Sequence, residues 1–266
     1  MRLLITGASG FIGSHLVSVA SKQGWDIVSF SRSGIKPEGA SKAFAWSFGQ
    51  KVPINAFEGV NYAIHLAHDF SGEKGAKETI ISTYEMALLL NSSGVQRQIF
   101  VSSYSAGNHS SSLYGKTKFQ LEKFLSKLPN ITIVRPGLVM GGGGLYGRIC
   151  HWSKVLPIIP LPDGGKGMIP VIEVGKLCVL LLEILRQQSP PLEANLFESE
   201  LISLRQLIIE FSAKGGKHPL IVPIPSNFLM FVLKITSFFH IRLPINEDNL
   251  KGFIKNQTAN HTRTQL

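Results

Sequence analysis

The chain has 266 residues, 44% of them hydrophobic, and a formal net charge of +10 at pH 7. This length is enough for one sizeable hydrophobic core with a small appended lobe. Residues 1–100 hold nine Lys/Arg against seven Asp/Glu, whereas residues 101–266 hold eighteen against ten. A basic later part fits a phosphorylated substrate, an anionic membrane surface or a dispersed, solvated surface. Because no Lys/Arg run with interleaved aromatics occurs, we expect no nucleic-acid partner.

The cysteines, the start of the chain and one apolar stretch bear on the compartment of the protein. Cys150 and Cys178 are the only cysteines, so we expect no disulfide framework, which fits a reducing compartment. A strand is predicted directly after Met1 and leaves no room for a signal peptide, so we expect a cytoplasmic protein. The apolar stretch at residues 221–241 is broken by two prolines and a lysine, and no transmembrane segment is predicted.

The chain begins with an apolar run at residues 3–5, which predicts a buried strand that leads into Gly7, Gly10 and Gly13. A helix is predicted from Phe11 to Lys22. Strand, glycine turn and helix in this order are typical of a dinucleotide-binding loop. Gly7 would permit the tight turn, Gly10 the approach of a pyrophosphate, and Gly13 the close packing of helix on strand. The phosphates would lie at the helix N-terminus, where free N–H groups favour negative charge.

The second strand is predicted at Asp26–Phe30, and Arg32 follows it between Ser31 and Ser33. An acidic residue at this position binds the adenosine ribose of NAD, whereas an arginine suits the 2′-phosphate of NADP. Because the position holds no acid, the sequence favours NADP, with NAD as the alternative. Arg32 is also compatible with a simple exposed loop.

The alternation of strands and helices continues to about residue 140. Further strands are predicted at residues 43–47, 60–67, 98–103 and 131–135. Helices are predicted at 73–93 and 111–128, and then near 145–155, 174–186 and 204–213. Such alternation implies right-handed crossovers and a parallel sheet with helices on both faces. We therefore predict an α/β chain with a Rossmann-type, doubly wound parallel sheet and a small, mostly helical C-terminal substrate lobe.

The predicted boundaries place an NAD(P)-binding domain at residues 1–140, with strand and helix contributions from later residues, and a substrate lobe with C-terminal helices at 141–255. Gly141–Gly144 and Pro157–Pro170 are predicted as loops over a site. The apolar run at 228–239 has helical spacing. It fits a helix packed on the main domain, or a face for a membrane or partner. The tail at 256–266 is polar and is predicted to be disordered.

Three residues form the candidate reaction centre. Tyr114 and Lys118 are four apart and share one face of the predicted helix. An ammonium near a phenol stabilises the phenolate, so the tyrosine can act as a general acid or base. Ser103 ends the preceding strand, at the sheet edge where such folds bind ligands, and its hydroxyl can hydrogen-bond a substrate oxygen.

Four stretches together resemble the extended short-chain dehydrogenases/reductases of the NAD-dependent epimerase/dehydratase family. They are Thr6–Gly13 (TGASGFIG), His65–Ala67 (HLA), Val101–Ser103 (VSS) and Tyr114–Lys118 (YGKTK). Arg135-Pro136-Gly137, followed by Val139-Met140-Gly141, also resembles the entry to the family's substrate loop. The matching stretches span residues 3–141 in the expected order.

The resemblance implies roles for the three central residues. Tyr114 would be the catalytic acid/base, Lys118 would lower its pKa and bind the nicotinamide ribose, and Ser103 would orient the substrate. Hydride would pass between a substrate carbon and nicotinamide C4. The predicted cofactor-binding residues are Thr6, Gly7, Ser9, Gly10, Phe11, Ile12, Gly13, Arg32, Ser33, Leu66, Ala67, Tyr114, Lys118 and Pro136. His65 and His68 are given no role, and no residues have metal-ligand spacing.

The chain departs from the family pattern at three places. The gap between Ser103 and Tyr114 is shorter than in sugar-nucleotide epimerases. Thr79 stands where the family commonly has asparagine, and Lys176 stands where an acid is common. These departures identify an atypical member.

The leading hypothesis is an NAD(P)-dependent enzyme acting on a nucleotide-activated sugar, with a homodimer possible. Tyr104 and Ser105 follow Ser103 where a dehydratase usually has an acid pair. This favours epimerisation or simple reduction over dehydration. Two alternatives stay open: a non-catalytic NADP-binding member with a structural or regulatory role, and a reductase of non-sugar carbonyl compounds.

Overall fold

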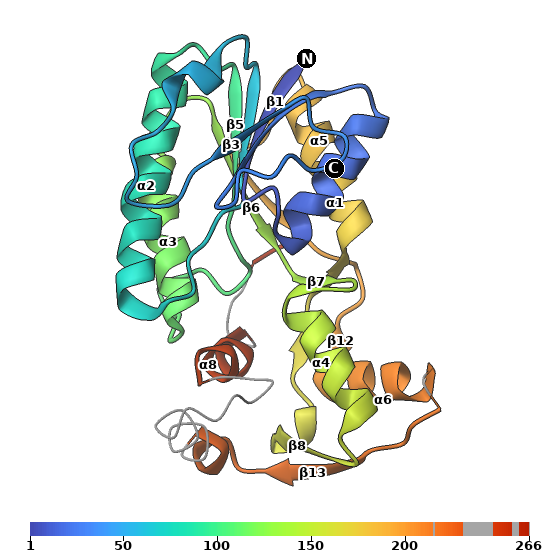
Figure 1. Cartoon of the computed structure of the whole chain (residues 1–266). Helices are drawn as coiled ribbons and strands as arrows, with labels where there is room; N and C mark the ends of the chain where they lie inside the picture. Colours follow the sequence, from blue (N-terminus) through green and yellow to red (C-terminus); the bar gives the residue numbers. More distant parts are fainter. Residues whose placement is uncertain (215, 231–246, 257–260, 266) are drawn as a thin grey trace.

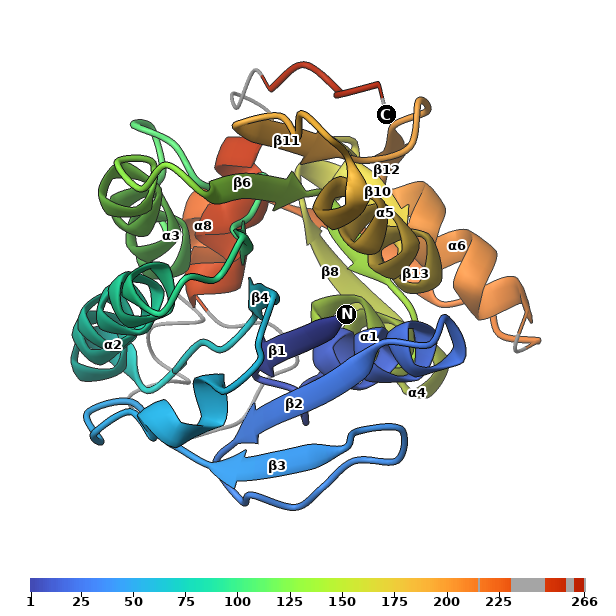
Figure 2. The same ribbon diagram turned by 90° about the horizontal axis from the view of Figure 1, so that it is seen from above.

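A seven-stranded sheet, parallel throughout, forms the centre of the molecule (Figures 1 and 2). The computed structural model describes residues 1–214, 216–230, 247–256 and 261–265. In spatial order the strands are β11 (Glu193–Leu196), β6 (Ile131–Pro136), β5 (Arg97–Val101), β4 (Tyr62–His65), β1 (Arg2–Thr6), β2 (Asp26–Ser31) and β3 (Lys42–Ala45). The order reverses at β1, so the carboxyl edge beside β1 and β4 is where such sheets bind ligands.

Helices cover both faces of this sheet, which confirms the predicted doubly wound architecture (Figures 1 and 2). α1 (Phe11–Lys22) and α5 (Val174–Arg186) pack on one face, and α2 (Gly72–Ser92) and α3 (Leu113–Leu125) on the other. The sequence analysis predicts α1 and α5 with these bounds. The central strands are buried on both sides, and so are almost continuously apolar.

Each face of the sheet has its own core. On one face, Leu16 and Val17 of α1 meet Leu177 and Leu181 of α5, all 1% exposed or less. The cores of the opposite face are centred on Met86, Leu90, Leu121 and Phe100. Burying each such side chain contributes about 1.5–3 kcal/mol. The helices are thereby fixed against the strands whose ends carry the candidate site.

The lobe below the sheet contains the helices α4 (Gly144–Val155), α6 (Leu204–Lys214) and α8 (Glu247–Asn256) (Figure 1). It also contains three strand pairs: β7 (Leu138–Met140) with β10 (Val171–Glu173), β9 (Met168–Ile169) with β12 (Ile202–Ser203), and β8 (Ile158–Pro162) with β13 (Leu220–Ile224). Two short 3₁₀ turns lie at Ile54–Phe57 and Asp163–Gly165. Ile149, Leu161, Ile169, Leu207 and Ile208 belong to a separate core within the lobe. None of the helices described here is long and apolar enough to cross a membrane.

The strands of the lobe and one edge strand of the sheet differ from the predictions, since β7, β10, β12 and β13 lie where no strand is predicted. The Pro157–Pro170 stretch, predicted as a loop, contains β8 and β9. Prolines are tolerated there because β8 belongs to a two-stranded pair, in which a missing N–H interrupts no wider sheet. β11 was not predicted at all, because its sequence Glu-Ala-Asn-Leu is short and only half apolar, as befits a sheet edge.

The C-terminal tail differs from its prediction where it is described. Residues 261–265 contact the sheet edge rather than lying free: Thr264 N donates to Asn195 O at 2.9 Å, and Asn195 N donates to Thr264 Oγ1 at 2.8 Å. Residues 257–260 and 266 lie outside the described residues. The apolar run at 228–239 is described only up to residue 230, within a helix that begins at residue 226. The rest of the run also lies outside the described residues.

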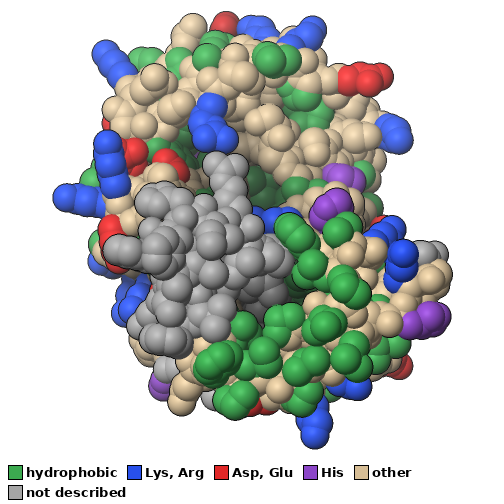
Figure 3. Space-filling model, turned by 60° about the horizontal axis from the view of Figure 1, so that its bottom comes forward, with side chains coloured by type: hydrophobic (Ala, Val, Ile, Leu, Met, Phe, Trp, Pro, Cys, Tyr) green, Lys and Arg blue, Asp and Glu red, His purple; other side chains and the backbone are tan. Residues whose placement is uncertain are grey.

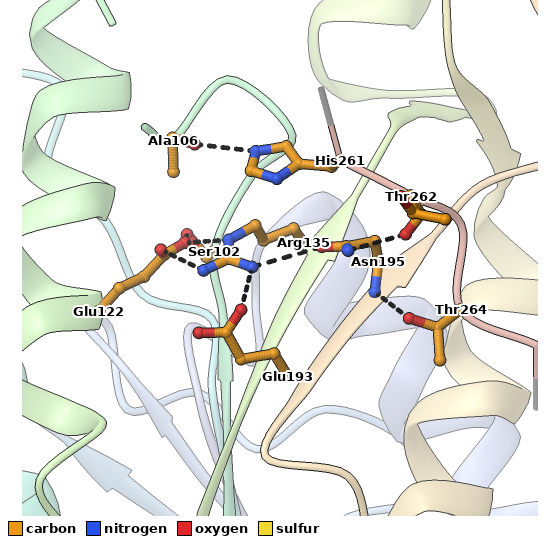
Figure 4. A network of polar contacts seen from close by, with 9 residues as sticks. All are labelled: Ser102, Ala106, Glu122, Arg135, Glu193, Asn195, His261, Thr262 and Thr264. Atoms are coloured by element: carbon orange, nitrogen blue, oxygen red, sulfur yellow. Dashed lines mark hydrogen bonds and ion pairs between the residues drawn. The ribbon is translucent and has the colours of Figure 1, made fainter. Parts of the chain in front are cut away.

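A buried polar cluster joins α3 to the sheet (Figure 4). Arg135 on β6 donates from Nε and Nη2 to both carboxylate oxygens of Glu122 on α3, at 2.9 and 2.7 Å. Its Nη1 donates to Glu193 on β11 at 2.6 Å, and Ser102 donates to Glu122 at 2.5 Å. The Arg135 and Glu122 side chains are 9% and 5% exposed. This bidentate pair is therefore almost fully removed from water.

Replacing Glu122 with alanine should lower the free energy of unfolding by about 3–5 kcal/mol, because it leaves the buried Arg135 charge with Glu193 and Asn195 as its remaining partners. The matched control is Glu193→Ala. The Glu193 side chain is 54% exposed, and losing this pair should cost about 1 kcal/mol or less. Urea unfolding of the two variants measures the difference. Equal losses would show that the Glu122 pair is no stronger than the exposed one.

Candidate active site

The turn after β1 is pressed against the loop after β4. Gly7 has φ +70°, and a Cβ placed there would lie 2.8 Å from Ala67 N and 3.1 Å from Leu66 C. Thr6 Oγ1 accepts hydrogen bonds from Leu66 N at 3.2 Å and Ala67 N at 3.4 Å. Only glycine suits this combination of positive φ and close backbone approach.

The start of α1 is built for a phosphate. A Cβ on Gly13 would lie 2.2 Å from Gly7 O, so the helix can pack this closely only with glycine. Gly10 donates to Gly7 O at 2.9 Å and precedes Phe11 as the residue that caps the helix. Gly10 has no side chain to cap α1, and the first turn holds no acid. The free N–H groups at the start of α1 are therefore suited to an anion, and the loop fits a dinucleotide pyrophosphate.

Phe11 joins this loop to the glycine loop at the entrance to the lobe. Cβ atoms placed on Gly141 and Gly143 would lie 2.7 and 2.6 Å from the Phe11 ring, and one on Gly144 would lie 3.1 Å away. The ring occupies the space that side chains at these positions would need. The sequence analysis predicted both loops, and the structure packs them together.

Arg32 and Ser33 lie just beyond β2, and both are exposed. Gly34 N donates to Ser31 Oγ at 3.2 Å, and Ile35 N donates to Ser33 Oγ at 3.3 Å, which orders the turn. Hydrogen bonds from Ser71 and, to a smaller extent, the Arg32 charge lower the pKa of Asp69. The Arg32 charge after β2 thus influences the Asp69 carboxylate in the loop after β4, on the other side of β1.

Ser103, Tyr114 and Lys118 come together at the carboxyl edge of β5. Ser103 hydrogen-bonds the Tyr114 hydroxyl and lies 2.9 Å from Ser105 Oγ. Lys118 is buried one turn along α3 from Tyr114. Its Nζ donates to Val101 O at 2.7 Å and lies 5.7 Å from the centre of the Tyr114 ring. The three predicted residues therefore form one site.

The pKa values at this site are set mainly by burial. Burial raises the pKa of Tyr114 to about 12, and the Ser103 hydrogen bond opposes this shift. Burial lowers the pKa of Lys118 to about 7, and the nearby Glu122 charge opposes it. We expected Lys118 to lower the Tyr114 pKa, but here its ammonium is directed to Val101 O. The phenol is consequently protonated at neutral pH.

Two rings on the β4–α2 loop contact Tyr114, and the sequence analysis gave neither a role. The Phe70 ring is stacked on Tyr114 with centroids 5.8 Å apart, and the His68 ring meets Tyr114 edge-on at 4.8 Å. Phe70 is exposed. Burial lowers the pKa of His68 to about 3, so this imidazole is neutral. No local pattern marks either residue, because their positions follow from how the loop folds over α3.

The lobe reaches the same helix through α8. The Asp248 carboxylate accepts hydrogen bonds from Leu113 N and, at 3.2 Å, from Tyr114 N. A carboxylate at a helix N-terminus satisfies free N–H groups and complements the helix dipole. Ser111 Oγ also donates to Lys251 O at 3.4 Å. Asp248 is separated from Tyr114 by most of the later chain, so sequence spacing could not reveal this contact.

The remaining predicted residues lie near these groups. Pro136 ends β6, and its carbonyl accepts a hydrogen bond from Tyr104 N at 2.9 Å. Ile12 O accepts a weak bond from the Cys178 thiol of α5 at 3.9 Å. Ser9 is exposed on the glycine loop. Within the described ranges, no three His, Cys, Asp or Glu side chains are grouped so as to hold a metal ion.

Comparisons with known proteins bear on the family and the fold of this chain. Residues 3–143 match the model of the NAD dependent epimerase/dehydratase family. No curated protein matches the chain. A nucleoside-diphosphate-sugar epimerase from Staphylococcus aureus has a similar structure, with TM-score 0.77, 16% identity, and 98% of this chain and 93% of that chain covered.

Two further solved structures share the fold. MoeE5 in complex with UDP-glucuronic acid and NAD has TM-score 0.71 and 17% identity, with 85% of this chain and 86% of that chain covered. UDP-glucose 4-epimerase from Thermus thermophilus in complex with NAD has TM-score 0.67 and 16% identity, with 98% of this chain and all (100%) of that chain covered.

Stability should depend on pH through His65, which lies behind the site. Its Nε2 is 2.9 Å from Gln98 Oε1, and burial lowers its pKa to about 4. The unfolded chain therefore binds more protons between about pH 6.5 and pH 4. The free energy of unfolding should be highest above pH 6.5, where His65 is neutral in both states, and should fall by up to about 3 kcal/mol as the pH drops to 4.

Urea unfolding at several pH values measures this dependence, and two variants assign it. His65→Asn keeps a donor near Gln98 but does not titrate, so its pH dependence should be shallower. His15→Asn, at an exposed position on α1, is the matched control and should keep the wild-type dependence. An unchanged slope in His65→Asn would contradict the assignment.

Proposed function

We propose that this chain, which belongs to the NAD-dependent epimerase/dehydratase family, is an NAD(P)-dependent oxidoreductase or epimerase that acts on a nucleotide-activated sugar. The observation that carries the proposal is the meeting of Ser103, Tyr114 and Lys118. They come from two separate segments, the loop after β5 and helix α3, and lie at the sheet edge that also holds the glycine loop. A purely structural nucleotide site would need the loop alone.

The residues divide the chemistry between them. A bound nicotinamide would supply a hydride donor or acceptor. In reduction, protonated Tyr114 gives its proton to the carbonyl oxygen as that oxygen becomes an alcohol, and Ser103 orients the oxygen. In oxidation, the proton returns to the phenolate, which the Ser103 hydrogen bond stabilises. Lys118, whose charged form the Glu122 carboxylate favours, would bind the nicotinamide ribose.

Two features support a nucleotide-sugar substrate and the class of reaction. The basic later part of the chain and the loop at 141–144, packed on Phe11, suit a ligand with a diphosphate. The similar structures named above include a nucleoside-diphosphate-sugar epimerase and a complex with UDP-glucuronic acid. Ser105, rather than an acid, lies against Ser103. This favours epimerisation or simple reduction over dehydration.

Replacing Tyr114 with phenylalanine should reduce turnover to background and leave cofactor affinity within about twofold, because the change removes the transferable proton but keeps the ring. Turnover is measured with purified protein, UDP- and TDP-sugars and simple carbonyl compounds. Cofactor affinity is measured by nicotinamide fluorescence. Tyr84→Phe, on the neighbouring helix α2, is the matched control and should keep wild-type turnover. Activity retained in Tyr114→Phe would exclude Tyr114 as the acid/base.

The same assays separate the alternatives. Turnover of a nucleotide-sugar supports the proposal. Turnover only of simple carbonyl compounds would identify a reductase of non-sugar substrates. Cofactor binding without turnover of any of these compounds would indicate a structural or regulatory member.

Within this proposal NADP is the preferred cofactor, because Arg32 follows β2 where NAD-specific folds place an acid. Replacing Arg32 with alanine should weaken NADPH binding about tenfold and leave NADH binding nearly unchanged, since only NADPH has the 2′-phosphate. Lys36→Ala, in the same exposed loop, is the control and should affect neither cofactor. Fluorescence titration with both cofactors measures the effect, and equal weakening would refute the 2′-phosphate role.

A further inference from the structure

A two-stranded ribbon at the end of the lobe has an apolar outer side. β8 and β13 pair in parallel, with Ile158 opposite Leu220 and Pro160 opposite Val222. Ile159 and Leu161, the alternate residues of β8, are buried in the core of the lobe. Side chains alternate along a strand, so Ile158 and its partner Leu220 lie on the opposite side. They are 53% and 64% exposed.

The exposed apolar surface extends beyond the ribbon at both ends. Val155, just before β8, is 57% exposed, and Phe228, just after β13, is 56% exposed. Figure 3 shows hydrophobic side chains gathered on the face that lies at the bottom of Figure 1, where β8 and β13 run. We call the surface formed by Val155, Ile158, Leu220 and Phe228 the apolar face. Exposed apolar side chains gathered on one face mark an interaction site more often than scattered ones do.

The segments that form β8 and β13 are poor in acidic residues. The sequence has no Asp or Glu between Glu122 and Asp163, and none between Glu210 and Glu247. These two acid-free stretches are far apart in the chain, and the structure brings them side by side as β8 and β13. The pairing therefore concentrates positive charge beside exposed aliphatic side chains.

Two lysines carry positive charge at the end of the ribbon where β8 and β13 begin. Lys154 precedes Val155 and is exposed, with its ammonium 4.8 Å from the centre of the Phe211 ring. Lys217 precedes β13 and is also exposed. Asp163 follows β8 at the opposite end, where it accepts a hydrogen bond from Ser226 at 2.7 Å. The two lysines therefore lie at the end of the ribbon that carries Ile158 and Leu220, and Asp163 lies at the end that leads to Phe228.

We propose that the apolar face docks on an anionic lipid surface. Such a surface provides negative headgroups for Lys154 and Lys217 and an apolar layer for Ile158 and Leu220. A second copy of the chain fits less well, because it would bring a surface of the same charge against this one. Nucleic acid would satisfy the lysines but would leave the aliphatic side chains in water. Docking is peripheral and independent of the proposed reaction.

The experiment is sedimentation of the full chain with vesicles, either of phosphatidylcholine alone or of phosphatidylcholine mixed with phosphatidylglycerol. The chain should bind the mixed vesicles and not the neutral ones, and added salt should weaken binding. Leu220→Glu should weaken binding about tenfold, because it places a carboxylate in the apolar layer. Leu192→Glu is the matched control. Its side chain is 76% exposed before β11, away from the apolar face, and binding should be unchanged.

A charge-reversal pair provides the second test. Lys217→Glu should weaken binding to the mixed vesicles, whereas Lys51→Glu, at an exposed position in the first part of the chain, should not. Cofactor fluorescence shows that each variant is folded, and a failure of sugar turnover would not alter the vesicle result. Equal binding to neutral vesicles, or equal effects of a variant and its control, would overturn the proposal. Self-association detected by light scattering and abolished by Leu220→Glu would assign the face to a second copy.

Discussion

The ion pair between Arg135 and Glu122 is the interaction on which the candidate site depends. It joins β6 to α3, and α3 carries both Tyr114 and Lys118. Ser102, the residue before Ser103, donates to the same carboxylate. A charge buried this deeply is costly without matched geometry, so the pair favours the observed placement of α3 against the sheet. The Glu122 charge also favours the charged form of Lys118. The buried ion pair and the candidate reaction centre therefore share one carboxylate.

Burial gives the site its chemical character. It raises the pKa of Tyr114 and lowers that of Lys118, so both side chains are displaced toward their neutral forms. A neutral phenol hydrogen-bonded to Ser103 has the proton that the proposed carbonyl reduction would need. Asp248 adds a contact from the lobe to the first turn of α3. The placement of Tyr114 is thus linked to the part of the chain predicted to bind the substrate.

Features set by local chemistry could be predicted from the sequence, and features set by distant packing could not. The glycine loop and the helix over 11–22 follow from glycine spacing and apolar periodicity, which neighbouring residues determine. The prolines of β8 hide a strand, because only its pairing with β13 makes the extended backbone favourable. The contact of Phe70 with Tyr114 and the cap by Asp248 depend on how separate segments meet. The spacing of these residues in the sequence indicates neither contact.

The departures from the family pattern are compensated within the fold. Thr79 is buried and accepts a hydrogen bond from Asp69 N at 3.0 Å, so its hydroxyl orders the loop that carries His68 and Phe70. Lys176, where an acid is common, pairs with Glu198 at 2.6 Å. Neither change disturbs Ser103 or Tyr114. The distinctive part of this chain is the lobe, whose apolar face lies at the end away from the sheet (Figure 1). Because the apolar face and the Ser103–Tyr114–Lys118 cluster lie on separate parts of the fold, substitutions in the face can be made without touching these three residues.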